Sequence, residues 1–183
     1  MVNDIDPLSQ KRGEIQEAMN FLAALASGME QVVGRGAGGM SFAAGRKLGK
    51  QFSEKARKSD DLLEALGEVR RVLTDNHCLW EFEPFKPKAQ AELVTTMPDG
   101  GQEISIVFRD CMIRQALFRF GHAQQGSLCS MMYGFFSGAL EAITGRRAEL
   151  EIVHAGENAC LKRLRLRPAA PGGALAHAKG RAA

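Results

Sequence analysis

Residues 127 to 166 read SLCSMMYGFFSGALEAITGRRAELEIVHAGENACLKRLRL and predict a buried helix followed by two strands. Over residues 128 to 144 the stretch is apolar around most of a helix circumference, and Gly145 suits the left-handed conformation that ends many helices. Alternation of apolar and charged residues then predicts a pair of strands around residues 149 to 152 and 160 to 167. We therefore expect a central helix next to a closing pair of strands.

Two glycines of the predicted helix, Gly134 and Gly138, are four residues apart and so share one side of it. A residue without a Cβ lets another part of the structure come close to the helix backbone. The pair therefore predicts close approach of another backbone, a helix or a ligand on that side.

The residues before this stretch predict three helices, three strands and one short helix. The first three helices are expected over residues 7 to 34, about 41 to 56, and about 61 to 75, the third capped by Ser59 or Asp60. The strands are expected over residues 78 to 83, 91 to 97 and 102 to 109, the last two joined by a Pro-Asp-Gly-Gly turn. The short helix is expected from Cys111 to Phe120.

This order, with runs of strands separated from runs of helices, predicts an α+β fold in which an antiparallel sheet packs against helices. A chain of 183 residues is the size of one ordinary domain. We expect a flexible N-terminus over residues 1 to 7, one ligand-binding domain over 8 to 167, and a disordered basic tail over 168 to 183.

The composition is that of a soluble globular protein, with 45% hydrophobic residues, 25% charged residues and a net charge of +3. This balance gives no reason to expect direct nucleic-acid binding. No membrane span and no secretory signal are predicted, so we expect a cytoplasmic protein. In that compartment Cys78, Cys111, Cys129 and Cys160 would stay reduced, as buried thiols or as metal ligands.

Four residues near the end of the chain form a chemically sensible set of zinc ligands: Cys129, Glu151, His154 and Cys160. No Cys-x-x-Cys or similar local pair is present, so tertiary folding would have to bring Cys129 to the other three. Glu151 and His154 are three residues apart and would share a face only where the strand bends or ends between them. The alternative is that both cysteines are core thiols, Glu151 is solvated and His154 lies in a turn.

Aromatic residues and methionines supply enough apolar bulk to line a cavity for a hydrophobic small molecule. His122 and Tyr133 would offer polar groups to such a ligand. The same apolar residues would equally form a filled core, because a methionine-rich helix is adaptable packing material. The predicted ligand-binding set is Trp80, Phe108, Leu117, Phe120, His122, Met132, Tyr133 and Phe136, and Met131 and Phe135 belong to the same apolar group.

Three segments carry a resemblance to a known family: AAGRKLGKQF at 43 to 52, SDDLLEALGEVRRVL at 59 to 73, and LCSMMYGFFSGALEAITGR at 128 to 146. A strand containing a glutamate, then Gly156 and Glu157, then Cys160, complete the pattern. These residues are similar to the 4-vinyl reductase domain family, also called the hydrocarbon-binding domain. The family is related in fold to the TRAPP tethering-complex subunits.

The resemblance implies a stand-alone domain that binds a hydrophobic, aromatic or tetrapyrrole molecule and acts as sensor or carrier. It also implies a structural zinc ion, with Cys129, Glu151 and Cys160 at family positions and His154 where the family has its second cysteine. Two alternatives stay open: an accessory factor in bacteriochlorophyll or other tetrapyrrole 4-vinyl reduction, and a dimeric assembly module whose first helices form a homodimer face. A homodimer and a protein partner in signalling or pigment synthesis are further expectations, and catalysis by the chain alone is not expected.

Overall fold

The structure of the chain is a computed structural model that describes residues 7–169 apart from 79, 89, 110, 123 and 157, with side chains from residue 15 onward. Its elements are α1 (Pro7–Val33), α2 (Gly36–Phe52), α3 (Leu62–Asp75), β1 (Glu83–Phe85), β2 (Val94–Thr96), β3 (Gln102–Phe108), α4 (Met112–Arg119), α5 (Ser127–Thr144), β4 (Ala148–Ala155) and β5 (Cys160–Leu166). The predicted order of three helices, three strands, two helices and two strands is confirmed, and so is the α+β class. The predicted termini fall largely outside the described residues.

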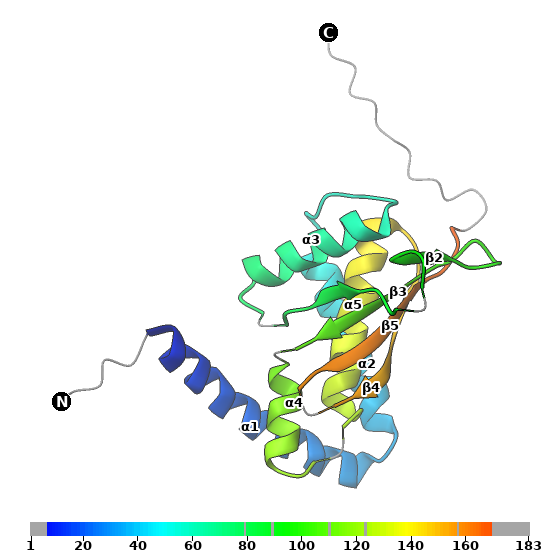
Figure 1. Ribbon diagram of the computed structural model, residues 1–183. Helices are drawn as coiled ribbons and strands as arrows, with labels where there is room; N and C mark the ends of the chain where they lie inside the picture. Colours follow the sequence, from blue (N-terminus) through cyan, green and yellow to red (C-terminus); the bar gives the residue numbers. More distant parts are fainter. Residues whose placement is uncertain are drawn as a thin grey trace.

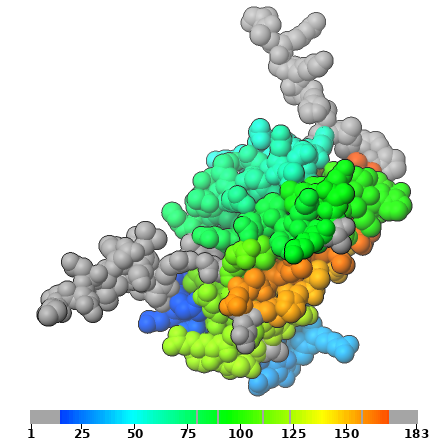
Figure 2. All heavy atoms as spheres, viewed as in Figure 1, coloured from blue at the N-terminus to red at the C-terminus, as the bar shows by residue number. Residues whose placement is uncertain are grey.

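The strands form one antiparallel sheet in the order β1-β3-β5-β4, with β2 also paired to β3. Along β5, residues at even positions are buried and residues at odd positions are partly exposed, because side chains alternate between the two faces of a strand. α5 lies against the inner face, while β4 and β5 reach the surface on the other side (Figures 1 and 2). The inner sheet face and α5 therefore bound the core.

The outer sheet face is held by ion pairs across neighbouring strands. Glu103 on β3 contacts Arg163 at 3.4 Å and Arg165 at 2.8 Å, both on β5. Arg167, just beyond β5, contacts Glu149 on β4 at 2.9 Å. Exposed pairs such as these contribute little individually, so the sheet depends chiefly on the apolar residues of its inner face.

α2 packs along α5 more extensively than any other two elements pack together. Gly45 and Gly49 of α2 face α5, and Gly134 and Gly138 of α5 face α2. A Cβ at any of the four would overlap backbone atoms of the opposite helix. The predicted close approach at Gly134 and Gly138 is therefore confirmed, and the structure that approaches is a helix.

Charged side chains reinforce the same contact. Glu141 of α5 accepts hydrogen bonds from Arg46 at 2.5 Å and from Lys50 at 2.8 Å, both on α2. Partial burial alone would raise the pKa of Glu141, but these two hydrogen bonds lower it. Glu141 is therefore ionised at neutral pH and joins the two helices.

The start of α5 is fixed by α1. The carboxylate of Glu30, near the end of α1, accepts a hydrogen bond from the backbone N–H of Ser127 at 2.5 Å. A carboxylate at this position satisfies an N–H that the helix itself leaves unpaired and interacts favourably with the helix dipole. At the other end of α5, Gly145 has φ of 70°, so the predicted left-handed helix end is confirmed.

Several predicted boundaries differ from the structure, and three of the differences have a clear physical reason. α2 begins at Gly36, inside the glycine-rich segment, because packing on α5 stabilises helix there and buries Ala37. The cap of α3 is Asp61, whose carboxylate accepts from the N–H of Glu64 at 2.8 Å. The first strand is β1, later in the chain than predicted, because residues 83 to 85 are the ones that pair with β3.

In the part of the chain that the structure describes, no helix is long and apolar enough to cross a membrane.

We expect Gly138→Ala to lower the free energy of unfolding by on the order of 3 kcal/mol, because the added methyl group would push α2 away from α5. Gly67→Ala is the matched control, since nothing lies within 4 Å of a Cβ at that exposed position of α3. Helix propensity should make the control more stable by up to about 1 kcal/mol. Urea unfolding of both variants checks this, and equal stability of the two would contradict the close helix contact.

Candidate functional site

Lys162 is a buried lysine on the inner face of β5, with a relative exposure of 1%. Its Nζ lies 2.9 Å from the sulfur of Met132, 4.4 Å from the ring centroid of Phe108 and 5.0 Å from that of Tyr133. A thioether is a weak acceptor, and aromatic rings attract a cation only moderately. Among the described residues, no carboxylate pairs with Lys162, although buried lysines are normally paired.

Tyr133 is the second polar group at this place. Its hydroxyl is buried and has no hydrogen-bond partner among the described residues. Burial raises the pKa of Tyr133, so the phenol keeps its proton. A buried hydroxyl without a partner loses its hydration with no compensating bond, which makes the position unfavourable unless something else binds there.

Three buried thiols lie in the neighbourhood of the same amine. Cys111, Cys129 and Cys160 are buried and free, and each lies close enough to act on the pKa of Lys162. Burial raises the pKa of Cys129 and of Cys160, and the charge of Lys162 only partly opposes this. Burial also disfavours the charged form of Lys162, which lowers the pKa of that amine. Because these two thiols stay protonated at neutral pH, they do not supply a counter-ion.

Four different elements place these residues together. β5 supplies Cys160 and Lys162, α5 supplies Cys129, Met132 and Tyr133, β3 ends at Phe108, and Cys111 immediately precedes α4. Phe108 and Cys160 are direct partners in the β3–β5 register. We call the group Phe108, Cys111, Cys129, Met132, Tyr133, Cys160 and Lys162 the Lys162 cluster.

Arg114 is the other buried cation, and it differs from Lys162. Its guanidinium donates to the backbone carbonyls of Arg109 at 2.9 Å and Asn158 at 3.4 Å. Arg114 therefore ties α4 to the loop before β5 through one guanidinium nitrogen, while its Nε has no hydrogen-bond partner among the described residues.

The structure does not bring the four predicted zinc ligands together. β4 has a bulge between Ile152 and His154, and the resulting register places Glu151 opposite Arg163 and His154 opposite Leu161. Arg163 and Leu161 belong to the outer face of β5, whereas Cys160 belongs to its inner face. The sheet therefore separates Glu151 and His154, on its outer face, from Cys129 and Cys160, on its inner side.

The environment of each predicted ligand agrees with that separation. Glu151 is paired with Arg163 at 3.0 Å, His154 is exposed, and Cys129 and Cys160 are buried in the Lys162 cluster. Within residues 7–169, as far as they are described, no three His, Cys, Asp or Glu side chains are gathered as ligands for one metal ion. The residues present do not fit the predicted zinc site.

The predicted ligand-binding residues separate into several groups. Phe108, Met132 and Tyr133 belong to the Lys162 cluster, and Phe136 packs on Phe108 with ring centroids 5.6 Å apart. Trp80 contacts Phe135, 5.5 Å between centroids, so it packs farther along α5. The remaining residues are Leu117 and His122, which line a small cavity, and Phe120, which is exposed.

Two hollows stand out in the described structure. One is a cavity of about 50 Å³ between the end of α1 and the start of α5, lined by Ala26, Ser27, Glu30, Leu117, His122, Gly126 and Leu128. It is large enough for water but not for an aromatic ring. The other is an open, charged depression on α2 and α5, lined by Lys47, Lys50, Gln51, Glu54, Lys58, Glu141 and Ala142. The predicted apolar bulk around α5 is closely packed in this structure.

Lys162 was missed by sequence reasoning, although the signal was present. In Cys160, Lys162, Leu164 and Leu166 every second residue points inward, and the lysine interrupts an otherwise apolar inner face. A charged residue at a core position of a strand is a departure from the pattern and indicates a functional or structural requirement.

Comparison with solved structures identifies a protein of similar fold. The chain is similar to the phenol-responsive sensory domain of the transcription activator PoxR, solved with phenol, with a TM-score of 0.58 and 17% sequence identity. The match covers 81% of this chain and 74% of that one. No family model and no curated protein matches the chain, so membership of the 4-vinyl reductase family remains a prediction. The chain therefore shares the α+β fold of that sensory domain.

We expect Lys162→Met to raise the free energy of unfolding by about 1 to 3 kcal/mol near neutral pH, because it replaces an unpaired buried amine by an apolar chain of similar length. Unfolding returns Lys162 to water and to its ordinary pKa of 10.5, so the unfolded chain binds more protons between the lowered folded pKa and 10.5. Through this residue the stability of the native chain rises with pH across that window. The advantage of the variant should therefore shrink as the pH approaches 10.5.

Urea unfolding of both proteins near neutral pH and near pH 10.5 measures this difference. A variant less stable than the native chain at both pH values would show that Lys162 has a partner that stabilises it.

Proposed function

We propose that this chain binds a small hydrophobic molecule, aromatic molecules included, in the interior between α5 and the inner face of the sheet, and that it acts as a sensor or carrier. The observation that carries the proposal is the Lys162 cluster, where two unpaired polar groups lie inside an apolar interior. Binding sites for small molecules combine mostly apolar walls with a few such polar groups. The shared fold with a domain crystallised with phenol supports the same reading.

The surroundings of the cluster suit an apolar ligand. Phe108, Met132 and Phe136 are fully buried, and the rings of Phe82, Phe108 and Phe136 contact one another with centroids 5.1 to 5.7 Å apart. Met132 is unbranched and adapts its shape more readily than a ring, so it is the side chain best able to move aside for a ligand. Entry of a ring-sized molecule therefore requires the interior to open beside α5.

The finer functions predicted from the resemblance have less support. Tetrapyrroles are much larger than the cavity of about 50 Å³, and the larger depression on α2 and α5 is open and lined mostly by charged side chains. Zinc would need ligands other than the four predicted. No contact among the described residues favours a role in bacteriochlorophyll synthesis. A cytoplasmic location stays a prediction.

We expect a bound ligand to slow alkylation of Cys129 and Cys160 by N-ethylmaleimide, because both thiols lie in the Lys162 cluster. Cys78 is a control within the same chain, since it is free, partly exposed and not part of the cluster. The chain, stripped of bound organic molecules, would be screened against phenols, small aromatic hydrocarbons and small acids by ligand-detected NMR, and alkylation would be followed by peptide mass spectrometry. Absence of binding across the whole screen, or equal protection of Cys78, would contradict the proposal.

A second candidate, the dimeric assembly module, is favoured by α1. Every third or fourth residue of this helix forms an exposed apolar stripe: Ile15, Ala18, Leu22, Leu25, Met29 and Val32. The spacing is that of the a and d positions of a heptad repeat, which in coiled coils face a partner helix. Val32 is 87% exposed and Leu25 is 51% exposed, so the stripe is not covered by the chain's own described residues.

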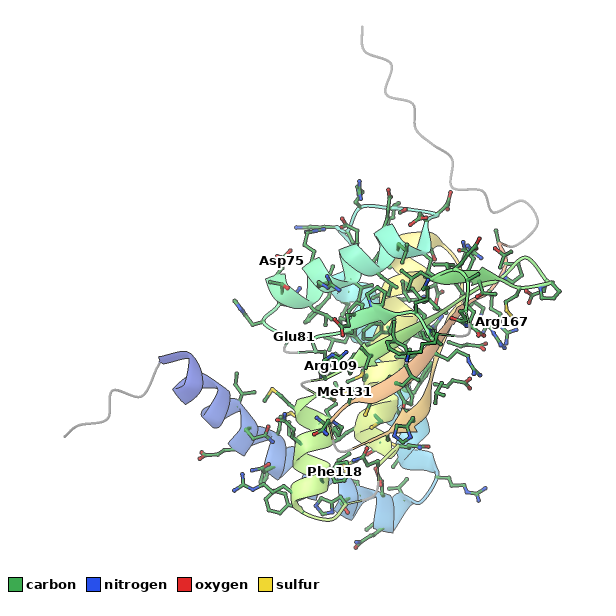
Figure 3. All side chains as sticks on the ribbon, in the orientation of Figure 1. Asp75, Glu81, Arg109, Phe118, Met131 and Arg167 are labelled. Atoms are coloured by element: carbon green, nitrogen blue, oxygen red, sulfur yellow. The ribbon has the colours of Figure 1, made fainter. Side chains whose placement is uncertain are left out.

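α1 lies at one end of the molecule, next to α4 (Figure 1), and Figure 3 shows Phe118 of α4 at the same end. Phe118 is 44% exposed and adds to the apolar surface there. A helix of 27 residues is long enough for a stable two-helix seam, which supports pairing with α1 of a second copy. Dimerisation and ligand binding use different parts of the structure and are compatible.

We expect the native chain to be a dimer by multi-angle light scattering and Leu25→Glu to be a monomer, because a carboxylate in the centre of the apolar stripe would be buried at the interface. Val153→Glu is the control, since Val153 is similarly exposed, at 47%, but lies on β4. A native chain that stays monomeric at every concentration would overturn the dimer proposal without affecting the ligand proposal.

A further inference from the structure

We propose that the ligand of this interior is a small apolar carboxylic acid, bound as its anion with the carboxylate oxygens on Lys162 Nζ and Tyr133 Oη. This inference rests on the proposed function and names the chemical class of the ligand. It follows from the hydrogen-bonding inventory, the charge and the walls of the Lys162 cluster.

The hydrogen-bonding inventory requires an acceptor. Among the described residues, the Lys162 amine has one hydrogen-bond contact, to the Met132 sulfur at 2.9 Å, and the Tyr133 hydroxyl has none. Arg114, by contrast, donates from one guanidinium nitrogen to two backbone carbonyl oxygens, those of Arg109 and Asn158. Oxygen acceptors are the groups that both unpaired donors need, and a carboxylate supplies two.

The charge balance requires an anion. Around Lys162 the ionisable neighbours are Cys111, Cys129 and Cys160, with Tyr133 facing it from α5 and Arg114 acting on Cys160 from α4. Burial raises the pKa of Cys129, Cys160 and Tyr133, so these three are neutral, and Arg114 is a cation. A carboxylate in contact with Nζ would favour the protonated amine and so restore the pKa of Lys162 that burial lowers.

The apolar residues around Lys162 favour a ligand whose remaining part, beyond the carboxylate, is apolar. Phe108, Met132 and Phe136 have no exposed surface: Phe108 and Met132 contact the Lys162 amine, and Phe136 packs on Phe108. An inorganic anion would gain the charge-assisted hydrogen bonds but no apolar contact, whereas a neutral aromatic molecule would gain the contact but leave the amine without a counter-ion. An apolar acid satisfies both requirements.

Two kinds of acid share this chemistry, aromatic acids and short aliphatic acids, and benzoate and hexanoate represent them. Nitrobenzene is the uncharged counterpart of benzoate, with nearly the same shape and two oxygens. Isothermal titration calorimetry of the full chain with the three probes should show one of the acids binding about tenfold or more tighter than nitrobenzene, because charge-assisted hydrogen bonds to Lys162 act on the acid alone. The acid that binds more tightly shows whether the apolar residues of the cluster favour an aromatic or an aliphatic group.

The variant that tests the contact is Lys162→Met, which keeps an apolar chain of similar length in the core. It should reduce affinity for the preferred acid by about tenfold or more, so that the acid no longer binds more tightly than nitrobenzene. Arg163→Met is the matched control, because it removes one positive charge from the adjacent residue of β5, on the outer sheet face, where Arg163 pairs with Glu103 and Glu151. It should leave both affinities unchanged.

Native binding should also take up protons. Because burial lowers the pKa of Lys162, acid binding to the neutral amine adds a proton to it, and titrations in two buffers of different ionisation enthalpy measure this uptake. Uptake should be largest at pH values between the lowered pKa of the ligand-free chain and 10.5, and it should be absent in Lys162→Met.

Three outcomes would overturn the inference. The first is tighter binding of nitrobenzene than of both acids, and the second is an unchanged acid preference in Lys162→Met. The third is binding of neutral phenols in the screen with no binding of either acid, which would leave the proposed function standing. Failure of every probe and every screened molecule to bind would instead overturn the proposed function itself.

Discussion

Backbone contact between α2 and α5 fixes the position of the central helix. Four glycines, Gly45 and Gly49 on α2 with Gly134 and Gly138 on α5, let the two helices meet without side chains between them. Such contact allows little sliding or rotation, since any Cβ in the seam would overlap the opposite backbone. Glu141 adds a charged tie to Arg46 and Lys50 at the edge of the same seam.

With α5 held on that side, its opposite side is directed at the inner face of the sheet. Met132 and Tyr133 are thereby brought to Lys162, and Glu30 of α1 holds the first turn of α5 through Ser127. The rigid helix seam therefore supports a cluster whose own polar groups are poorly satisfied. Natural folds retain such locally unfavourable positions chiefly where function requires them, and this is why the cluster is the strongest candidate for a ligand site.

The sequence predicted those features that depend on local chemistry. The order of the elements, the end of α5 at Gly145 and the glycine side of α5 follow from periodicity, from a left-handed residue and from missing Cβ atoms, all of which are readable within a few residues. The α+β class follows from that order. The position of β1 was not readable, because the strand is defined by pairing with β3 about twenty residues later and not by its own alternation.

The site was less predictable because it depends on which sheet face each side chain occupies. A one-residue bulge in β4 moves His154 to the outer face with Glu151, while Cys160 stays on the inner face, and no spacing rule reveals such a shift in advance. Lys162 was readable as an inward position of β5, but its unpaired state depends on four segments that meet only in the folded chain. Three of the eight predicted ligand-binding residues, Phe108, Met132 and Tyr133, belong to its cluster.

The charge state of Lys162 in the folded chain tests the central claim most directly. Carbon-13 labelled lysine, observed by NMR at Cε during a pH titration, reports the ionisation of each amine, and the Lys162 signal is identified by its absence in Lys162→Met. We predict that Lys162 titrates well below the ordinary lysine pKa of 10.5 in the ligand-free chain, because it is buried without a counter-ion. Titration of Lys162 together with the exposed lysines would show that the amine is solvated or paired, and would contradict the claim that β5 and α5 enclose an amine without a counter-ion.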